Sequence, residues 1–475
     1  MKKEPEMPPR RRSMSHPETG PYVIVNGCSI SNHLNGKIPV ANGRQVQTFN
    51  APTIHSQRPT TENKGYEAKG VREDEGDCMG RVTASAPGKC ILFGEHAVVY
   101  GQPAVAVAIE QRISVSIETL GSSSESWKID GMQFDPKRHP HVQALRNRLW
   151  QPQQGAPNLI IRISGDIPPA SGLGSSAALS VAASAALRTA RGRWYNTLNQ
   201  PQNSESWAEG YSSQFDNVNL YSTEDQELNA YRKGEAGNSM HYVSDESVVD
   251  LDECALLAHA VEAVAQGGRA SPMDASTCAH GGIILLSDTL ESNEEYLYTR
   301  RLKMPDGERI WHLHSIDLPK PTEEIFLVIG NTGVHAPTAQ QVAKVAATIE
   351  AHPERMKVIE TIGLIARRGI QSLREGDYAA VGRAMTENQI MLQSLGVSCP
   401  ELEDLIRAAA PTSLGAKLTG AGGGGCMVAL TTDPKQTSEA IELAGGRTLI
   451  SKFGNVGLSI DKTENLPLWN TKPNV

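Results

Sequence analysis

The sequence contains no apolar run that approaches the roughly 18 residues of a membrane span. Its first residues are charged or proline and lack the apolar core of a secretory signal, so we expect a soluble, cytoplasmic protein. The seven cysteines are scattered and never spaced as a zinc knuckle or a redox pair, a pattern that suits a reducing cytosol. The basic residues form no long stripe and the formal net charge is −8, which argues against nucleic acid or an anionic membrane as partner. Small molecules remain as the expected partners.

The chain is long enough, at 475 residues, for two or three domains. Residues 1–80 are rich in Pro, Asn, Gly, Ser and charges, and we expect them to be a disordered tail. Residues 188–250 also lack apolar periodicity and are predicted to form a low-order insertion. The remainder divides into an N-terminal domain at 81–322, a C-terminal domain at 323–463 and a tail at 464–475.

Hydrophobic patterning predicts a chain of alternating strands and helices. In the first half we expect a helix at 176–187, a helix from 250 to about 266, and strands at 82–86, 90–93, 104–109, 113–117, 158–164 and 281–286. Tight turns at Pro87-Gly88 and at 101–103 are expected to separate the first strands. In the second half we expect strands at 324–329, 415–419, 426–430 and 455–461, with helices near 336–352, 353–374, 376–394, 399–410 and 434–445.

A glycine- and serine-rich loop, Pro-Pro-Ala-Ser-Gly-Leu-Gly-Ser-Ser-Ala-Ala at 168–178, lies between a predicted strand and a predicted helix. Glycines let the backbone approach an anion, and a helix N-terminus offers free N–H groups, so a phosphate fits there. Ser175 and Ser176 add hydroxyls that suit phosphate or Mg²⁺. The loop lacks the Gly-Lys-Ser/Thr of a Walker motif, and a plain glycine turn capped by serines is the alternative.

A second segment, residues 86–101, carries Lys89 in a predicted turn and the adjacent Glu95 and His96 after a glycine. Unpaired charges in a mostly apolar stretch are unfavourable, so we expect these side chains to face a ligand. The alternative is a surface turn with solvated Lys and Glu side chains.

A third segment, residues 415–426, has five glycines among the six positions 420–425, between two predicted strands. So many glycines lose much conformational entropy on folding, which indicates a close approach of the backbone to another group. A flexible linker is the alternative, but linkers rarely separate two apolar strands of one domain. We therefore expect this loop to form a third wall of the same site.

Together the three segments resemble the signature motifs of the GHMP kinases, a family that includes galactokinases, homoserine kinases, mevalonate kinases and phosphomevalonate kinases. The resemblance covers residues 81–187 and 250–462, and residues 85–101 are most similar to the mevalonate kinase branch. It implies an α+β fold, in which an N-terminal α/β domain like domain 2 of ribosomal protein S5 is joined to a ferredoxin-like C-terminal domain. It also implies ATP and mevalonate as substrates and Mg²⁺ as cofactor, and it leaves a homodimer open.

The resemblance further implies the roles of individual residues. The ATP phosphates are expected at a loop made of Ala170, Ser171, Gly172, Leu173, Gly174, Ser175 and Ser176. The C-terminal glycine loop contributes Gly420, Ala421, Gly422, Gly423 and Gly424. The catalytic pair is Asp274 with Lys89, the substrate residues are Glu95, His96 and Thr332, and the metal ligands are Ser176 and Glu262.

One stretch, Gln-Gly-Gly-Arg-Ala-Ser-Pro-Met-Asp at 266–274, departs from the Pro-Ser-Gly-x-Asp of animal mevalonate kinases. It is closer to the archaeal branch and one residue longer, which loosens the register between Glu262 and Asp274. A solvated helix acid is the alternative for Glu262, and a turn or cap residue is the alternative for Asp274. The alternative functions are another GHMP kinase acting on phosphomevalonate, homoserine or a sugar, a related decarboxylase, and a non-catalytic ATP-binding regulatory homologue.

Overall fold

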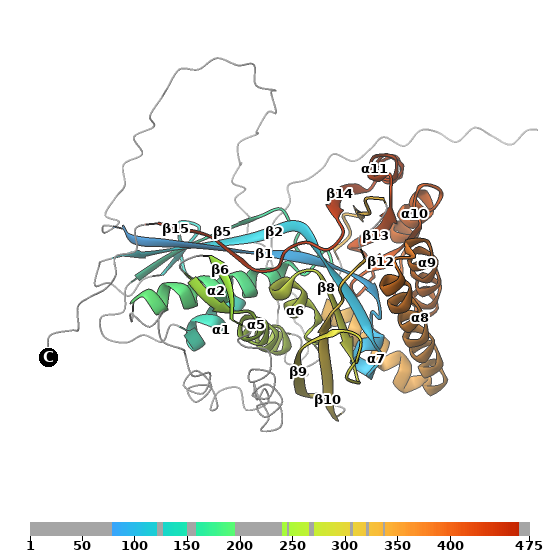
Figure 1. Cartoon of the computed structure of the whole chain (residues 1–475), viewed down its shortest axis with the longest axis horizontal. Helices are drawn as coiled ribbons and strands as arrows, with labels where there is room; N and C mark the ends of the chain where they lie inside the picture. Colours follow the sequence, from blue (N-terminus) through green and yellow to red (C-terminus); the bar gives the residue numbers. More distant parts are fainter. Residues whose placement is uncertain are drawn as a thin grey trace, which may run out of the picture. The chain divides into compact units, whose positions relative to one another are not determined.

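Two long antiparallel strands, β1 (Cys78–Phe93) and β2 (Ala104–Leu120), organise the first half of the molecule (Figure 1). The computed structural model describes residues 78–120, 127–149, 158–194, 240–244, 247–265, 270–304, 307–319, 323–335 and 338–464, all within the unit Ala68–Val475. Most of the predicted tail at 1–80, residues 195–239 of the predicted insertion and the last eleven residues lie outside this part. Within the range of the predicted insertion, residues 188–194 continue a helix, and the strands at 240–244 and 247–250 form a hairpin.

Nine strands form the larger sheet of the described residues. All neighbouring strands run antiparallel except β3 and β5. At the start of β1 the buried Val82 and Ala84 alternate with the half-buried Arg81 and Thr83, as expected for a strand with one face in the core. The sheet order is β4 (Met132–Gln133), β3 (Lys128–Ile129), β5 (Asn158–Gly165), β2, β8 (Ile283–Ser287), β10 (Gly307–Ser315) and β9 (Glu295–Met304), with β1 between β2 and β15 (Ser459–Glu464).

Helices rich in small residues pack under this sheet. The alanine-rich helix α2 (Ser175–Trp194) contacts both long strands, and Figure 1 shows it beside α1 (Pro140–Leu149), α5 (Leu251–Ala265) and α6 (Met273–His280). The hairpin of β6 (Met240–Ser244) and β7 (Ser247–Asp250) leads into α5. None of the helices in the described ranges is long and apolar enough to cross a membrane.

The second half forms a four-stranded antiparallel sheet, in the order β12 (Gly415–Thr419), β13 (Cys426–Thr431), β11 (Phe326–Asn331) and β14 (Arg447–Lys452). The connections give the β-α-β-β-α-β order of ferredoxin-like domains, with extra helices in the first crossover. The side chains of Asp377 and Asp433 cap the helices that follow them. The helices of the second half are α7 (Thr338–Ala351), α8 (Met356–Glu375), α9 (Tyr378–Ser394), α10 (Pro400–Ala409) and α11 (Pro434–Leu443), with short 3-10 turns η3 (Pro353–Arg355) and η4 (Ala410–Thr412). A further 3-10 turn, η1 (Ala97–Tyr100), follows β1 in the first half.

Four predictions about strands and turns were wrong, and β14 was not predicted. The strands expected at 82–86 and 90–93 are one strand, and so are those expected at 104–109 and 113–117. The predicted turn at Pro87-Gly88 is instead a shift of register between Pro87 and Lys89, because pairing with β2 continues on both sides and a bulge accommodates the proline. The last strand, β15, pairs with β1 and not with the second sheet.

The helix α8 joins the two halves. Its Gly363 and Gly369 lie so close to the first half that an added Cβ would come 1.9 Å from Gln102 Oε1 and 2.4 Å from the Phe93 ring. Only a residue without a side chain allows this approach.

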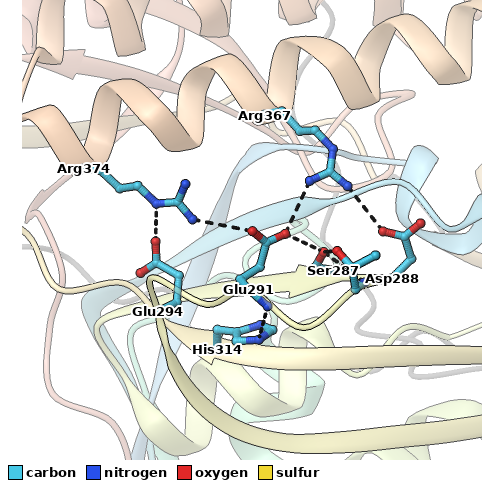
Figure 2. Close-up of polar contacts among 8 residues, drawn as sticks. Ser287, Asp288, Glu291, Glu294, His314, Arg367 and Arg374 are labelled. Carbon is cyan, nitrogen blue, oxygen red and sulfur yellow. Dashed lines mark hydrogen bonds and ion pairs between the residues drawn. The ribbon is translucent and has the colours of Figure 1, made fainter.

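Arginines of α8 add a polar cluster beside this contact (Figure 2). Arg367 lies 3.3 Å from both Asp288 and Glu291, and Arg374 pairs with Glu291 at 3.7 Å and with Glu294. These acids belong to the segment that connects β8 to β9. The cluster therefore fixes α8 to the larger sheet by charge as well as by packing.

Candidate active site

Lys89 lies at the register shift of β1 and points into the protein, with 2% of its side chain exposed. Its backbone N–H donates to Leu173 O at 3.0 Å, and its ammonium donates to Gly172 O at 2.9 Å. The ammonium also lies 3.1 Å from Asp274 Oδ2. One buried lysine thus joins the loop before α2 to the start of α6.

The loop of residues 170–176 runs directly into the N-terminus of α2. Ala170, Gly172 and Gly174 all have positive φ, which turns the backbone sharply before the helix. A Cβ on Gly174 would lie 3.1 Å from the side chain of Lys89, so this glycine makes room for the lysine. Ser176 lies in the first turn of α2, where backbone N–H groups lack helical acceptors and favour an anion.

The C-terminal glycine loop packs against this loop. Gly420 and the four glycines from 422 to 425 have positive φ, a conformation that strains other residues. An added Cβ on Gly172 would lie 2.8 Å from Thr419 O, and one on Gly420 would lie 2.9 Å from Gly172 Cα. The N–H of Cys426 also donates to Ser171 O at 3.0 Å. The two loops predicted from separate motifs therefore form one continuous surface.

Asp274 brings a carboxylate to the ammonium of Lys89. It lies in the first turn of α6, which Pro272 precedes. Its side chain is 36% exposed, so the carboxylate is open to solvent while the lysine is held from within. Burial, together with the charge of Asp274, raises the pKa of Cys278 one turn later, so this thiol stays protonated and unreactive.

Glu262 projects from α5 and is 7% exposed, with its Oε1 3.4 Å from Nε2 of His141 on α1. Burial lowers the pKa of His141 to about 4, so the ring is neutral near pH 7. The charges of Asp274 and Glu262 both contribute to the raised pKa of Cys278. A carboxylate and the hydroxyl of Ser176 are oxygen donors that suit Mg²⁺. Because the described residues contain no group of three or more His, Cys, Asp or Glu able to hold a metal ion, Mg²⁺ would need further oxygens from phosphate and water.

Two of the predicted substrate residues lie against the glycine loop. His96 Nε2 donates to Ala421 O at 2.9 Å, and burial lowers the pKa of His96 to about 4. The N–H and the hydroxyl of Thr332 donate to Gly425 O at 2.9 and 2.8 Å. Both residues therefore help to shape the wall of the site, and their contact with a substrate stays a prediction.

Glu95 lies in the same region but is turned into the protein, with 2% of the residue exposed. Its Oε1 forms an ion pair with Lys417, and its Oε2 accepts a hydrogen bond from Asn388 Nδ2 at 3.1 Å. The pairing gives Glu95 contacts inside the protein, and its contact with a substrate stays a prediction. The sequence analysis did not predict either partner of Glu95. A lysine within the apolar strand β12, whose five residues are all buried, was nevertheless a signal that a buried acid lies nearby.

Comparison with known families gives two matches. The model "GHMP kinases N terminal domain" matches residues 141–213, which include the phosphate loop. The model "GHMP kinases C terminal" matches residues 370–445, which include the glycine loop. The two sheets thus correspond to the two domains that the resemblance implied, and the predicted α+β fold is confirmed.

Relatives point to one branch of this family. The mevalonate kinase of Archaeoglobus fulgidus is 31% identical over 350 residues, which cover 73% of this chain and 91% of that protein. The mevalonate kinase of Thermococcus onnurineus is 29% identical over 411 residues, covering 80% and 99%. The solved structure of Methanococcus jannaschii mevalonate kinase shares the fold, with a TM-score of 0.52, 22% identity, and coverage of 80% of this chain and 100% of that one. This chain belongs to the mevalonate kinase family of the GHMP kinases.

Proposed function

We propose that this chain catalyses the ATP-dependent phosphorylation of mevalonate to 5-phosphomevalonate, in the mevalonate route to isoprenoids. The observation that supports the chemistry is the contact of Lys89 Nζ with Asp274 Oδ2 at 3.1 Å and with Gly172 O at 2.9 Å. A cation, a carboxylate and the phosphate-binding end of a helix then meet at one point. Phosphoryl transfer needs such positioning and charge neutralisation, and little covalent chemistry from the protein. The acceptor is inferred from the mevalonate kinase relatives.

The nucleotide phosphates belong at the N-terminus of α2. The N–H groups of residues 172–176 and the positive end of the helix dipole favour negative charge there. Gly172 and Gly174 let the phosphates approach the backbone, and Gly420 lets the second loop close over them. In this arrangement the γ-phosphate lies near Lys89.

Asp274 acts on the acceptor hydroxyl. The hydroxyl oxygen forms the new bond to phosphorus, the bond to the β,γ-bridging oxygen breaks, and ADP leaves with that electron pair. The hydroxyl proton goes to Asp274, or Asp274 only orients the hydroxyl beside Lys89. The exposed position of Asp274 suits either role, while the buried Lys89 neutralises charge on the phosphoryl oxygens.

Ser176 and Glu262 are the residues that would hold Mg²⁺ with the ATP phosphates. Bound Mg²⁺ supplies neutralisation of phosphate charge and polarises the phosphoryl oxygens. His141 beside Glu262 keeps a neutral ring there and adds no competing positive charge at pH 7.

We also propose a cytoplasmic enzyme with domains at 81–322 and 323–463. The free cysteines suit a reducing compartment; in the described ranges they are Cys90, Cys254, Cys278, Cys399 and Cys426. A homodimer stays open as the assembly state, and light scattering on the full chain measures it.

A panel of acceptors tests the function. The full chain is incubated with ATP, Mg²⁺ and either mevalonate, phosphomevalonate, homoserine or galactose, and ADP release is followed. We expect kcat/KM for mevalonate to exceed the others by about 100-fold, or about 2.7 kcal/mol. A higher kcat/KM for another acceptor, or ATP binding without turnover on any of them, contradicts the proposal.

A variant tests the role of Asp274. If the turnover of Asp274→Asn stays within about tenfold of the wild type, a difference of about 1.4 kcal/mol, the role assigned to Asp274 is wrong.

A further inference from the structure

Lys417 is a fully buried cation in β12. Its ammonium forms an ion pair with Glu95 and donates to Leu418 O at 2.6 Å, and Ile91 O lies 3.5 Å away. A charge inside an apolar strand is tolerated only where such partners replace water. Burial lowers the pKa of Lys417 and raises that of Glu95, and the attraction between the two charges opposes both shifts.

Glu95 has a second buried partner, Asn388 of α9, whose side-chain N–H donates to Oε2 at 3.1 Å. Asn388 is 0% exposed. We name Glu95, Lys417 and Asn388 the Glu95 triad. It joins the segment after β1, the strand β12 and the helix α9, which come from both halves of the molecule.

The triad is part of a row of contacts along β12 and the loop that follows. Thr419 Oγ1 accepts a hydrogen bond from Ile91 N at 2.8 Å, and Ala421 O accepts one from His96 Nε2 at 2.9 Å. Lys417 and Thr419 lie two positions apart in β12, so their side chains share one face of the strand, and the backbone carbonyl of Ala421 continues the row in the loop that follows. The start of the glycine loop and the position of His96 are therefore set by the same row.

His96 has a strained backbone, with φ 60° and ψ −37°. The N–H of Ala97 donates to Glu95 O at 2.7 Å, which closes a three-residue turn around His96. A residue other than glycine keeps this conformation only where its surroundings determine it strongly, and such strain is concentrated at functional sites. The side chain of Glu95, anchored on one side of this turn, supplies that constraint.

We propose that the Glu95 triad is a positioning device that holds His96 in its strained turn against the glycine loop, so that Glu95 acts through Lys417 and Asn388 and not on the substrate. The inference rests on the proposed function, because it places His96 on the acceptor side of that site. Breaking the triad releases His96 and the end of β12 together. The part of the site formed by His96 and the glycine loop then loses its shape, while the loop at 170–176 keeps its own contacts with Lys89.

The first experiment is a rescue of activity. Glu95→Gln and Lys417→Met each leave one buried charge unpaired, and we expect each to lower kcat/KM by about 100-fold. The KM for mevalonate should rise more than the KM for ATP. The double variant leaves no unpaired charge, and we expect it to recover at least about tenfold over either single variant. The control is Glu387→Gln, which removes an exposed ion pair with Arg368 next to the triad and should leave activity unchanged.

The second experiment needs no turnover and so separates this inference from the proposed function. In ¹⁵N-histidine NMR of the full chain, His96 should stay neutral from pH 8 to 5, because burial and the charge of Lys417 keep its pKa at about 4. In Asn388→Ala, Glu95 loses one anchor, and His96 should titrate closer to the ordinary value of about 6.5. His96→Gln identifies the NMR signal of His96.

Two outcomes overturn the proposal: a double variant no more active than Glu95→Gln, or a His96 ring that stays neutral in Asn388→Ala. Failure of the wild type to phosphorylate mevalonate refutes the function, and the NMR result then decides on the triad.

Discussion

Replacement of Lys89 by methionine removes a buried cation and keeps the length of the side chain. The ammonium lies 3.1 Å from Asp274 Oδ2 and 2.9 Å from Gly172 O, and in the proposed site it contacts the transferred phosphoryl group at about 4 Å. At an effective dielectric constant of about 20, two unit charges 4 Å apart attract by about 4 kcal/mol. Loss of that interaction in the transition state alone corresponds to a decrease of about 10³-fold in kcat.

Steady-state kinetics with ATP and mevalonate measure this effect. We expect kcat of Lys89→Met to fall about 10³-fold, while the KM for ATP changes by less than about tenfold, because backbone groups of the loop still bind the ground-state phosphates. Lys344→Met is a matched control, since Lys344 also donates to a glycine carbonyl, Gly396 O at 2.8 Å, but on an exposed face of α7. A decrease below tenfold in a variant that melts at the temperature of the wild type would refute the assigned role of Lys89.

Three further predictions concern the loop and the cluster in Figure 2. Gly420→Ala puts a Cβ 2.9 Å from Gly172 Cα at a φ of 84°, so we expect a loss of about 1–3 kcal/mol in unfolding free energy and a lower kcat/KM, measured by urea titration and kinetics. His314 is buried and accepts the N–H of Glu291, and burial lowers its pKa to about 4. As the pH falls below about 6.5, the unfolded chain binds a proton at this histidine before the folded chain does, so the unfolding free energy should decrease by about 2 kcal/mol between pH 7 and 5. Urea titrations of His314→Gln should lack this decrease. Arg374→Met leaves two glutamates without this cation and should lower the unfolding free energy by about 2–3 kcal/mol in the same assay, whereas no shift of the urea midpoint would show that the cluster does not stabilise α8.

The helices of the second half could be predicted closely because their signals are local. In α8 the buried Ile359, Ile362 and Ile370 recur at helical spacing, and Gly376 ends the helix in a left-handed conformation. Asp377 then caps α9 by accepting the N–H of Ala380. Periodicity, stop signal and cap all lie within a few residues of one another, so no long-range information is needed.

Strand boundaries in the first half depended on long-range pairing and were predicted less well. Pro87 and Gly88 are typical turn residues, but β1 continues through them because β2 pairs with both flanking segments. The final strand was assigned to the second domain because it follows the helix predicted at 434–445, and β14 was not predicted; β15 instead pairs with β1, more than 350 residues earlier in the chain. Short polar strands such as β3 and the hairpin of β9 and β10 gave no pattern that was recognised.

The buried side chains of Lys89 and Glu95 illustrate what a charge in an apolar stretch can and cannot indicate. Lys89 and Glu95 both satisfy the rule that such a charge needs a partner, but the rule is silent on whether the partner is a ligand or another strand. The structure separates the two cases by the exposure of the carboxylate in each pair. Asp274, paired with Lys89, has 36% of its side chain exposed, whereas that of Glu95, paired with Lys417, is 1% exposed. A substrate hydroxyl can reach only the first carboxylate without displacing protein groups, which supports the proposal that the Lys89 pair carries the chemistry and the Lys417 pair positions the site.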